Sequence, residues 1–155
     1  MKRILIVYHS QQKGNTRRMA ELVAQGCRET AGVEVAVVNV NEARVDMNAA
    51  ERADAYAFGS PDYFTYMAGG LKQFFDDLCL ADWAGKKVKG KPYVAFLTHG
   101  GGGGAIKSIE AMGASFKLQQ VAPSVVCQGA PTGAAVEQSI ALGRALAQRV
   151  VREAL

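Results

Sequence analysis

The sequence predicts an α/β protein built on a doubly wound, five-stranded parallel sheet in three layers. Three observations support this prediction. Strand-like apolar runs alternate with segments of helical periodicity along all 155 residues. The first run is apolar almost throughout, as in a strand buried on both faces. Each later strand-like run follows a helical one, and this alternation is typical of parallel sheets with right-handed crossovers. The length favours a single domain, residues 1–155.

The first strand is expected at residues 3–9 (RILIVYH), and the first helix from Asn15 to about Thr30. Apolar and small residues in the helix recur at i, i+3, i+4, i+7 and i+8, which places them on one face. These residues are Met19, Leu22, Val23, Gly26 and Cys27.

The later elements repeat this pattern. Further strands are expected at residues 33–40, 54–60, 91–99 and 123–129. Helical spacing runs through residues 71–79, 106–116 and 136–151, and a short helix is possible within 41–53. Five strands in this alternation suit the order 2-1-3-4-5, whose ligands bind beyond the carboxyl ends of strands 1 and 3. The loops at 9–16, 60–68 and 98–104 are therefore expected to meet.

Composition narrows the class of protein. Hydrophobic residues make up 49% and charged residues 21% of the chain, which is ordinary for a globular domain. The cysteines Cys27, Cys79 and Cys127 lie far apart without metal-ligand spacing, so we expect reduced thiols and no metal site. No apolar run approaches the ~20 residues of a membrane span, and the first is too short for a signal peptide. We expect a cytoplasmic protein without membrane insertion.

The net charge is +4, but it does not indicate a nucleic-acid partner. Lysine and arginine are scattered, apart from GKKVKGK at residues 85–91, and no nucleic-acid-binding motif is present. We interpret the lysine-rich segment as a solvated loop.

The loop before the first helix is rich in hydrogen-bond donors and has no acidic residue. Its candidate binding residues are Ser10, Gln11, Gln12, Lys13, Gly14, Asn15 and Thr16. Amides at a helix N-terminus bind phosphate, and Lys13 and Arg17 can neutralise it. The alternative is that Asn15 or Thr16 merely caps the helix. Gly14 is followed by Asn15, so the nucleoside-triphosphate motif GxxxxGK[ST] fails; the dinucleotide motif is also absent from this turn. A mononucleotide with one terminal phosphate remains.

Two further loops offer groups suited to a flat ligand. Three aromatic residues, Tyr63, Phe64 and Tyr66, follow the third strand, and five glycines follow His99. Aromatic side chains at this edge can stack on a ring, or they can pack beneath the loop. Glycines let backbone N–H groups approach a ligand closely, or they form a hinge or lid.

Together, SQQKGNT, GSPDYFTYM, KQFFD and KPYVAFLTHGGGGG resemble the flavodoxin-like FMN-binding family, which includes flavodoxins and related quinone reductases. The resemblance implies FMN as the cofactor, with its phosphate at residues 10–16. It implies that the isoalloxazine ring is flanked on one side by Ser60, Pro61, Asp62, Tyr63, Phe64 and Thr65. It implies that the other side is flanked by Thr98, His99, Gly100, Gly101, Gly102 and Gly103.

The resemblance also implies a function, which is one-electron transfer between partner proteins through FMN. The alternative is an NAD(P)H-dependent reductase of quinones, flavins or similar small acceptors; flavin storage or sensing is also open. Two departures weigh against a pure carrier: the chain is basic, and its third loop offers His99 and glycines where carriers usually place an aromatic residue. Asp62 is the only acid inside the three loops and is expected to lower the flavin potential if it faces the ring. A monomer or dimer is expected.

Overall fold

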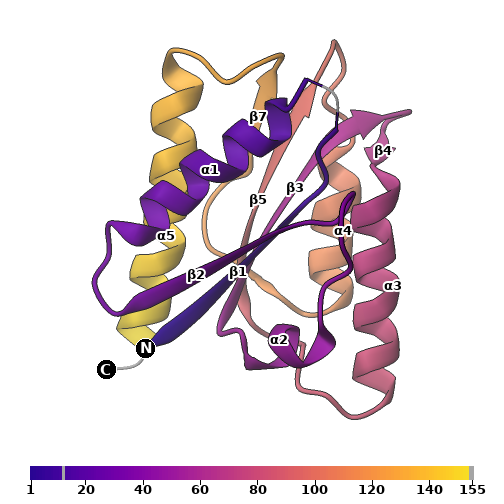
Figure 1. Cartoon of the computed structure of the whole chain (residues 1–155), viewed down its shortest axis with the longest axis vertical. Coiled ribbons are helices and arrows are strands. Elements are labelled where there is room, and N and C mark those ends of the chain that lie inside the picture. Colours follow the sequence, from indigo (N-terminus) through magenta and orange to yellow (C-terminus); the bar gives the residue numbers. More distant parts are fainter. Residues whose placement is uncertain (12, 154–155) are drawn as a thin grey trace.

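A computed structural model describes residues 1–11 and 13–153 of the chain (Figure 1). Five strands run parallel to one another in the central sheet. They are β1 (Lys2–Tyr8), β2 (Val33–Asn39), β3 (Ala55–Tyr63), β5 (Pro92–His99) and β7 (Val125–Gln128). Two short strands, β4 (Tyr66–Met67) and β6 (Gln119–Gln120), complete it.

The strand order is β2-β1-β3-β5, followed by β6 and β7, which both pair with β5. This confirms the expected order 2-1-3-4-5, with the fifth position divided between two strands. The third strand also differs from the prediction, because β3 continues beyond residue 60 to Tyr63 and returns through β4 as an antiparallel hairpin. The second loop is therefore a β-hairpin rather than an irregular connection.

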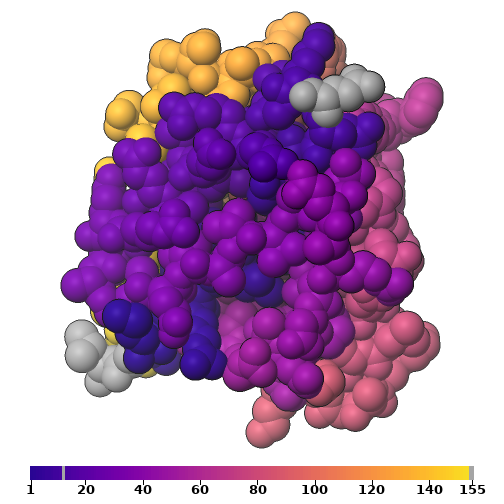
Figure 2. Space-filling model, in the orientation of Figure 1, coloured from indigo at the N-terminus to yellow at the C-terminus, as the bar shows by residue number. Residues whose placement is uncertain are grey.

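Helices cover both faces of the sheet (Figure 1). One face carries α1 (Asn15–Arg28) and α5 (Ala134–Glu153); the other carries α2 (Met47–Arg52), α3 (Gly69–Trp83) and α4 (Ile106–Ser115). Figure 2 shows that the first third of the chain, from α1 through β2 to α2, covers much of the side facing the viewer. In the described part of the chain, no helix is both long and apolar enough to cross a membrane.

The sheet divides the core into two apolar layers. Ile4, Ile6 and Met19 are buried on the α1–α5 side, and Phe58 and Phe74 on the α3 side. All three cysteines are free thiols. Burial raises the pKa of the Cys27 thiol to about 12, which keeps it protonated and unreactive at neutral pH.

Helices α1 and α5 cross unusually closely at two glycines. A Cβ on Gly26 would lie 1.9 Å from the carbonyl oxygen of Ile140, and one on Gly143 would lie 2.0 Å from the carbonyl oxygen of Val23. Neither position has room for a side chain, and this contact fixes how α1 lies on the sheet.

Candidate cofactor-binding site

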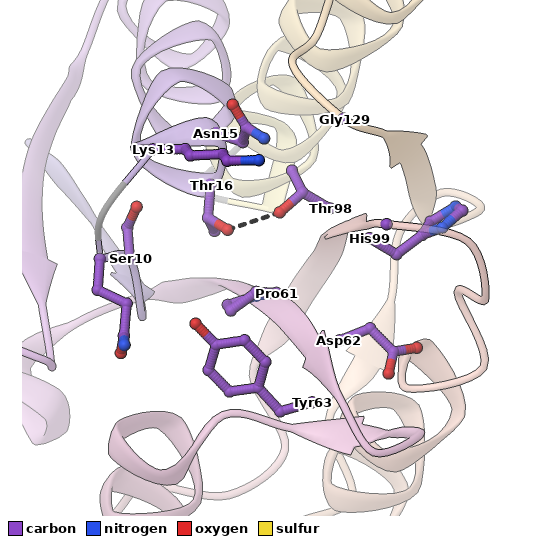
Figure 3. Close-up of a pocket in the computed structure, with 12 residues that line it drawn as sticks. Ser10, Lys13, Asn15, Thr16, Pro61, Asp62, Tyr63, Thr98, His99 and Gly129 are labelled. Carbon is purple, nitrogen blue, oxygen red and sulfur yellow. Dashed lines mark hydrogen bonds between the residues drawn. The ribbon is translucent and has the colours of Figure 1, made fainter.

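The three predicted loops meet in one cavity of about 260 Å³ at the carboxyl ends of β1, β3 and β5 (Figure 3). This confirms the expected meeting of the loops after the first, third and fourth predicted strands. The cavity is lined by Ser10, Gln11, Lys13, Asn15, Thr16, Pro61, Asp62, Tyr63, Thr98, His99, Gly100 and Gly129. Gln12, also a predicted binding residue, lies outside the described residues.

The first loop turns into α1 through Gly14. Gly14 has a left-handed backbone (φ 73°), is the N-cap residue and makes no side-chain cap hydrogen bond. The alternative that Asn15 or Thr16 caps the helix is therefore wrong; both belong to its first turn, and their side chains line the cavity. The first turn has no acidic residue, so its positive dipole end is available to an anion.

The charged groups of this loop differ in availability. Lys13 lines the cavity and, among the described residues, has no ion-pair partner. The Arg17 guanidinium lies 2.6 Å from a carboxylate oxygen of Glu42, while the Arg17 amide donates to Ser10 Oγ. Arg17 therefore holds the loop in place, and Lys13 is the cation that faces the cavity.

Sequence reasoning missed the residue that holds the first loop. Asn39, the last residue of β2, is buried; its Oδ1 accepts the Ser10 N–H at 3.0 Å, and its Nδ2 donates to the Ser10 carbonyl at 3.0 Å. The Asn41 N–H also donates to Asn39 Oδ1. The available signal in the sequence was an asparagine at the end of a strand rich in β-branched residues. Because β2 runs parallel to β1, the end of β2 lies beside the first loop.

His9 connects the first loop to two other segments. Its Nδ1 accepts the Gly70 N–H at 3.2 Å, so the ring hydrogen is on Nε2, which donates to Gln11 Oε1 at 2.7 Å. The His9 ring also meets the Tyr63 ring edge to face, with 6.2 Å between centroids. His9 therefore positions the Gln11 side chain of the first loop and the Tyr63 side of the cavity together.

Replacing Gly70 with alanine is expected to displace His9 and weaken FMN binding by about tenfold, through loss of one partly buried hydrogen bond. A Cβ at this position would lie 2.7 Å from His9 Nδ1 and 2.7 Å from the Val40 carbonyl oxygen. Titration with FMN, followed by quenching of flavin fluorescence, measures the effect. Gly69→Ala is the matched control, because a Cβ there meets nothing within 4 Å. Equal affinities for the two variants would contradict this role of His9.

The hairpin presents one aromatic side chain to the cavity. Tyr63 lines it, with its hydroxyl directed inward (Figure 3). Phe64 is fully exposed at the turn, and Tyr66 is also exposed. Phe64 and Thr65 both have left-handed backbones (φ 58° and 64°), which is strained for residues other than glycine. The three aromatic residues therefore do not act as one stacking group.

Ser60 stabilises the hairpin through two hydrogen bonds. It is fully buried, and its hydroxyl donates to the Pro61 carbonyl at 2.6 Å and accepts the Ala68 N–H at 2.8 Å. Its side chain lies outside the cavity. Phe64 and Thr65, also named as binding residues from the sequence, do not line it either.

The third loop reaches the cavity mainly through its first residues. Thr98 Oγ1 lies 2.7 Å from Thr16 Oγ1, and Gly100 also lines the cavity. The His99 imidazole is directed away from this pair (Figure 3), and its buried Nδ1 has no partner among the described residues. The later glycines that the sequence indicated, Gly101, Gly102 and Gly103, do not line the cavity.

Gly129 lines the cavity and was not predicted. It follows β7, and its N–H donates to the His99 carbonyl at 2.8 Å. A glycine directly after the last strand, at the sheet edge where the other loops gather, was the available signal.

The chain is similar in sequence to known proteins. A family model described as NADPH-dependent FMN reductase matches residues 46–127, slightly more than half of the chain. A flavodoxin from Aquifex aeolicus is 40% identical over 104 residues, which are 67% of this chain and 54% of that protein. An NAD(P)H dehydrogenase (quinone) from Archaeoglobus fulgidus is 34% identical over 128 residues, covering 65% of each chain. The chain thus spans between half and two thirds of the length of these relatives.

Solved structures share the fold over almost the whole chain. A flavodoxin from the domain Archaea has a TM-score of 0.84 at 25% identity, covering 96% of this chain and 99% of that one. A flavodoxin, WrbA-like protein from Agrobacterium tumefaciens has a TM-score of 0.81 at 21% identity, covering 98% and 99%.

Proposed function

Because the chain belongs to the flavodoxin-like FMN-binding family, we propose that it carries electrons one at a time between partner proteins through bound FMN. The observation that carries this proposal is the meeting of three loops in one cavity, with the α1 N-terminus at one side and Tyr63 at another. FMN supplies a ring that accepts and releases electrons; the protein binds it and sets its surroundings. We place this exchange in the cytoplasm, where the three free thiols stay reduced.

The first loop fits the phosphate of this cofactor. The α1 N-terminus supplies backbone donors and a positive dipole end. Ser10, Asn15 and Thr16 add side-chain donors, and Lys13 adds a positive charge. Asn39 holds the Ser10 backbone through two hydrogen bonds, so Ser10 is in position before an anion binds.

The other two loops fit a flat ring. Pro61 and Tyr63 line the cavity from β3, and Thr98 and Gly100 line it from the end of β5 and the loop that follows. The Thr16–Thr98 hydroxyl pair is buried between the phosphate loop and the third loop, so it fixes the distance between the two ends of the site. Together, these residues can orient the ring.

A second candidate function is reduction of a small acceptor at the expense of NAD(P)H. The glycine run favours it, because residues 100–102 carry no side chains and the His99 imidazole is directed away from Thr16 and Thr98. The third loop therefore places no side chain over the ligand, which leaves space for a second flat molecule. The name of the matching family model is consistent with such an activity.

The experiment is to purify the protein, identify the flavin it releases on denaturation, and mix the loaded protein with NADPH under anaerobic conditions. The carrier is expected to release FMN, to keep its visible flavin absorbance with NADPH, and to be reduced by light in two separate one-electron steps. Rapid bleaching by NADPH would establish the reductase instead. A protein that does not bind added FMN would overturn both functions.

A further inference from the structure

The carboxylate of Asp62 accepts three backbone hydrogen bonds from two different loops. Oδ1 accepts the Thr65 N–H at 2.8 Å, and Oδ2 accepts the N–H groups of Gly103 at 3.1 Å and Ala105 at 3.0 Å. Figure 3 shows this carboxylate directed toward the third loop. From the sequence, the charge of Asp62 is expected to act on the flavin ring. In the structure, this carboxylate is hydrogen-bonded to main-chain N–H groups.

A second side chain joins the same two segments. Ser108 Oγ accepts the Met67 N–H at 3.1 Å and donates to the Ala105 carbonyl at 2.6 Å. At Gly104, a Cβ would lie 2.8 Å from Thr65 Cγ2, so the Thr65 side chain packs directly against the backbone of the loop. Hairpin and third loop are thus packed as one unit.

The Asp62 bonds also account for the strained hairpin turn. Thr65 is β-branched and has a left-handed backbone, which persists only where the surroundings hold it. Its N–H is the one that Asp62 Oδ1 accepts. The same carboxylate therefore maintains the turn and fixes the loop opposite it.

The glycine run is held at both ends. At its start, the Gly100 carbonyl accepts from Gln128 Nε2 at 3.3 Å, and the neighbouring His99 carbonyl accepts the Gly129 N–H. At its end, Asp62 accepts from Gly103. A backbone segment that is fixed at either end keeps Gly100, which lines the cavity, at a constant position.

We propose that Asp62 is a positioning residue, which sets the third loop against the hairpin so that the glycine backbone is in place for the flavin before it binds. This inference rests on the proposed function and adds to it a residue that acts through the loop rather than by touching the ring. A role of the Asp62 charge and a role of its hydrogen bonds predict different results, and two substitutions distinguish them.

The test compares Asp62→Ala and Asp62→Asn with the wild-type protein. Both remove the charge, but asparagine keeps one oxygen acceptor. In FMN-free Asp62→Ala, hydrogen exchange at the amides of Gly103 and Ala105 is expected to accelerate at least about tenfold, because both lose their acceptor. Its dissociation constant for FMN is expected to rise about 10- to 100-fold, and that of Asp62→Asn by less than about fivefold. The midpoint potential of the bound flavin should also differ between the two variants.

Asp76→Ala is the control, since it removes an exposed carboxylate paired with Lys72 and should leave exchange and affinity unchanged. Unchanged exchange in Asp62→Ala, or equal affinities and potentials in the two Asp62 variants, would overturn the proposal. If Asp62→Ala does not fold, Asp62→Asn tests the proposal. The asparagine side chain has a single oxygen that can accept hydrogen bonds, so hydrogen exchange must accelerate either at Thr65 or at Gly103 and Ala105. A wild-type protein that binds no FMN overturns the proposed function, while exchange in the FMN-free variants still decides whether Asp62 holds the loop.

Discussion

Replacing Thr16 with valine is expected to weaken FMN binding about 10- to 100-fold. The affinity for riboflavin, which lacks the phosphate, is expected to fall by less than about threefold. Thr16 is buried in the first turn of α1 and lines the cavity, so its hydroxyl is placed to donate to a phosphate oxygen. Hydrogen bonds to charged groups contribute about 1.5–3 kcal/mol each, which sets the size of the effect. Valine keeps the shape of the side chain but removes the donor.

The two affinities are measured by the same fluorescence titration. Thr16→Ser restores the hydroxyl and should bind FMN nearly as tightly as the wild-type protein. The valine substitution also removes the partner of Thr98, whose Oγ1 lies 2.7 Å from Thr16 Oγ1 and is itself buried. Equal losses for FMN and riboflavin would therefore show that Thr16 supports the ring side of the cavity, and the phosphate assignment would be wrong.

Replacing Gly143 with alanine is expected to lower the free energy of unfolding by about 3 kcal/mol, which corresponds to a fall of about 6–12 °C in Tm for a domain of this size. The new Cβ would lie 2.0 Å from the Val23 carbonyl oxygen and 3.0 Å from the Cys27 amide nitrogen. Both neighbours are backbone atoms of α1, so a rotamer change cannot relieve the clash. The helices must separate, although both pack on the same face of the sheet.

Thermal and urea unfolding, followed by circular dichroism, measure this change. Gly69→Ala provides the control, since it adds the same methyl group to a helix with nothing within 4 Å. The control should be neutral or slightly stabilising, because alanine favours helix by up to about 1 kcal/mol over glycine. If Gly143→Ala matched the control, the close approach of α1 and α5 would not contribute to stability.

The sheet order could be predicted from the alternation of apolar runs, but the length of β3 could not. GSPD at residues 59–62 has the composition of a turn, and a proline normally interrupts a strand. In the structure β1 ends opposite Gly59, so β3 has no β1 partner beyond that point. The missing N–H of Pro61 therefore costs no hydrogen bond on the β1 side. On its other side, Pro61 still pairs with Thr98 of β5.

The loops of the site could be predicted because they follow strands directly in the sequence. The residues that hold these loops could not be predicted in the same way. Asn39 reaches Ser10 because β2 lies beside β1, and Gly129 reaches the cavity because β7 pairs with β5. The role of Asp62 depends on which backbone N–H groups the folded third loop directs toward it. Such contacts arise from tertiary neighbours and leave no periodic pattern.

An anchor made through main-chain N–H groups does not depend on the side chains at the start of the anchored loop. At Gly100 and Gly101 an added Cβ would meet nothing within 4 Å, and neither residue has a left-handed backbone. These two positions are therefore open to mutational drift and to deliberate grafting, for instance of an indole or a carboxylate. Side chains at the edge of the cavity can therefore be changed while the hydrogen bonds that hold the loop remain.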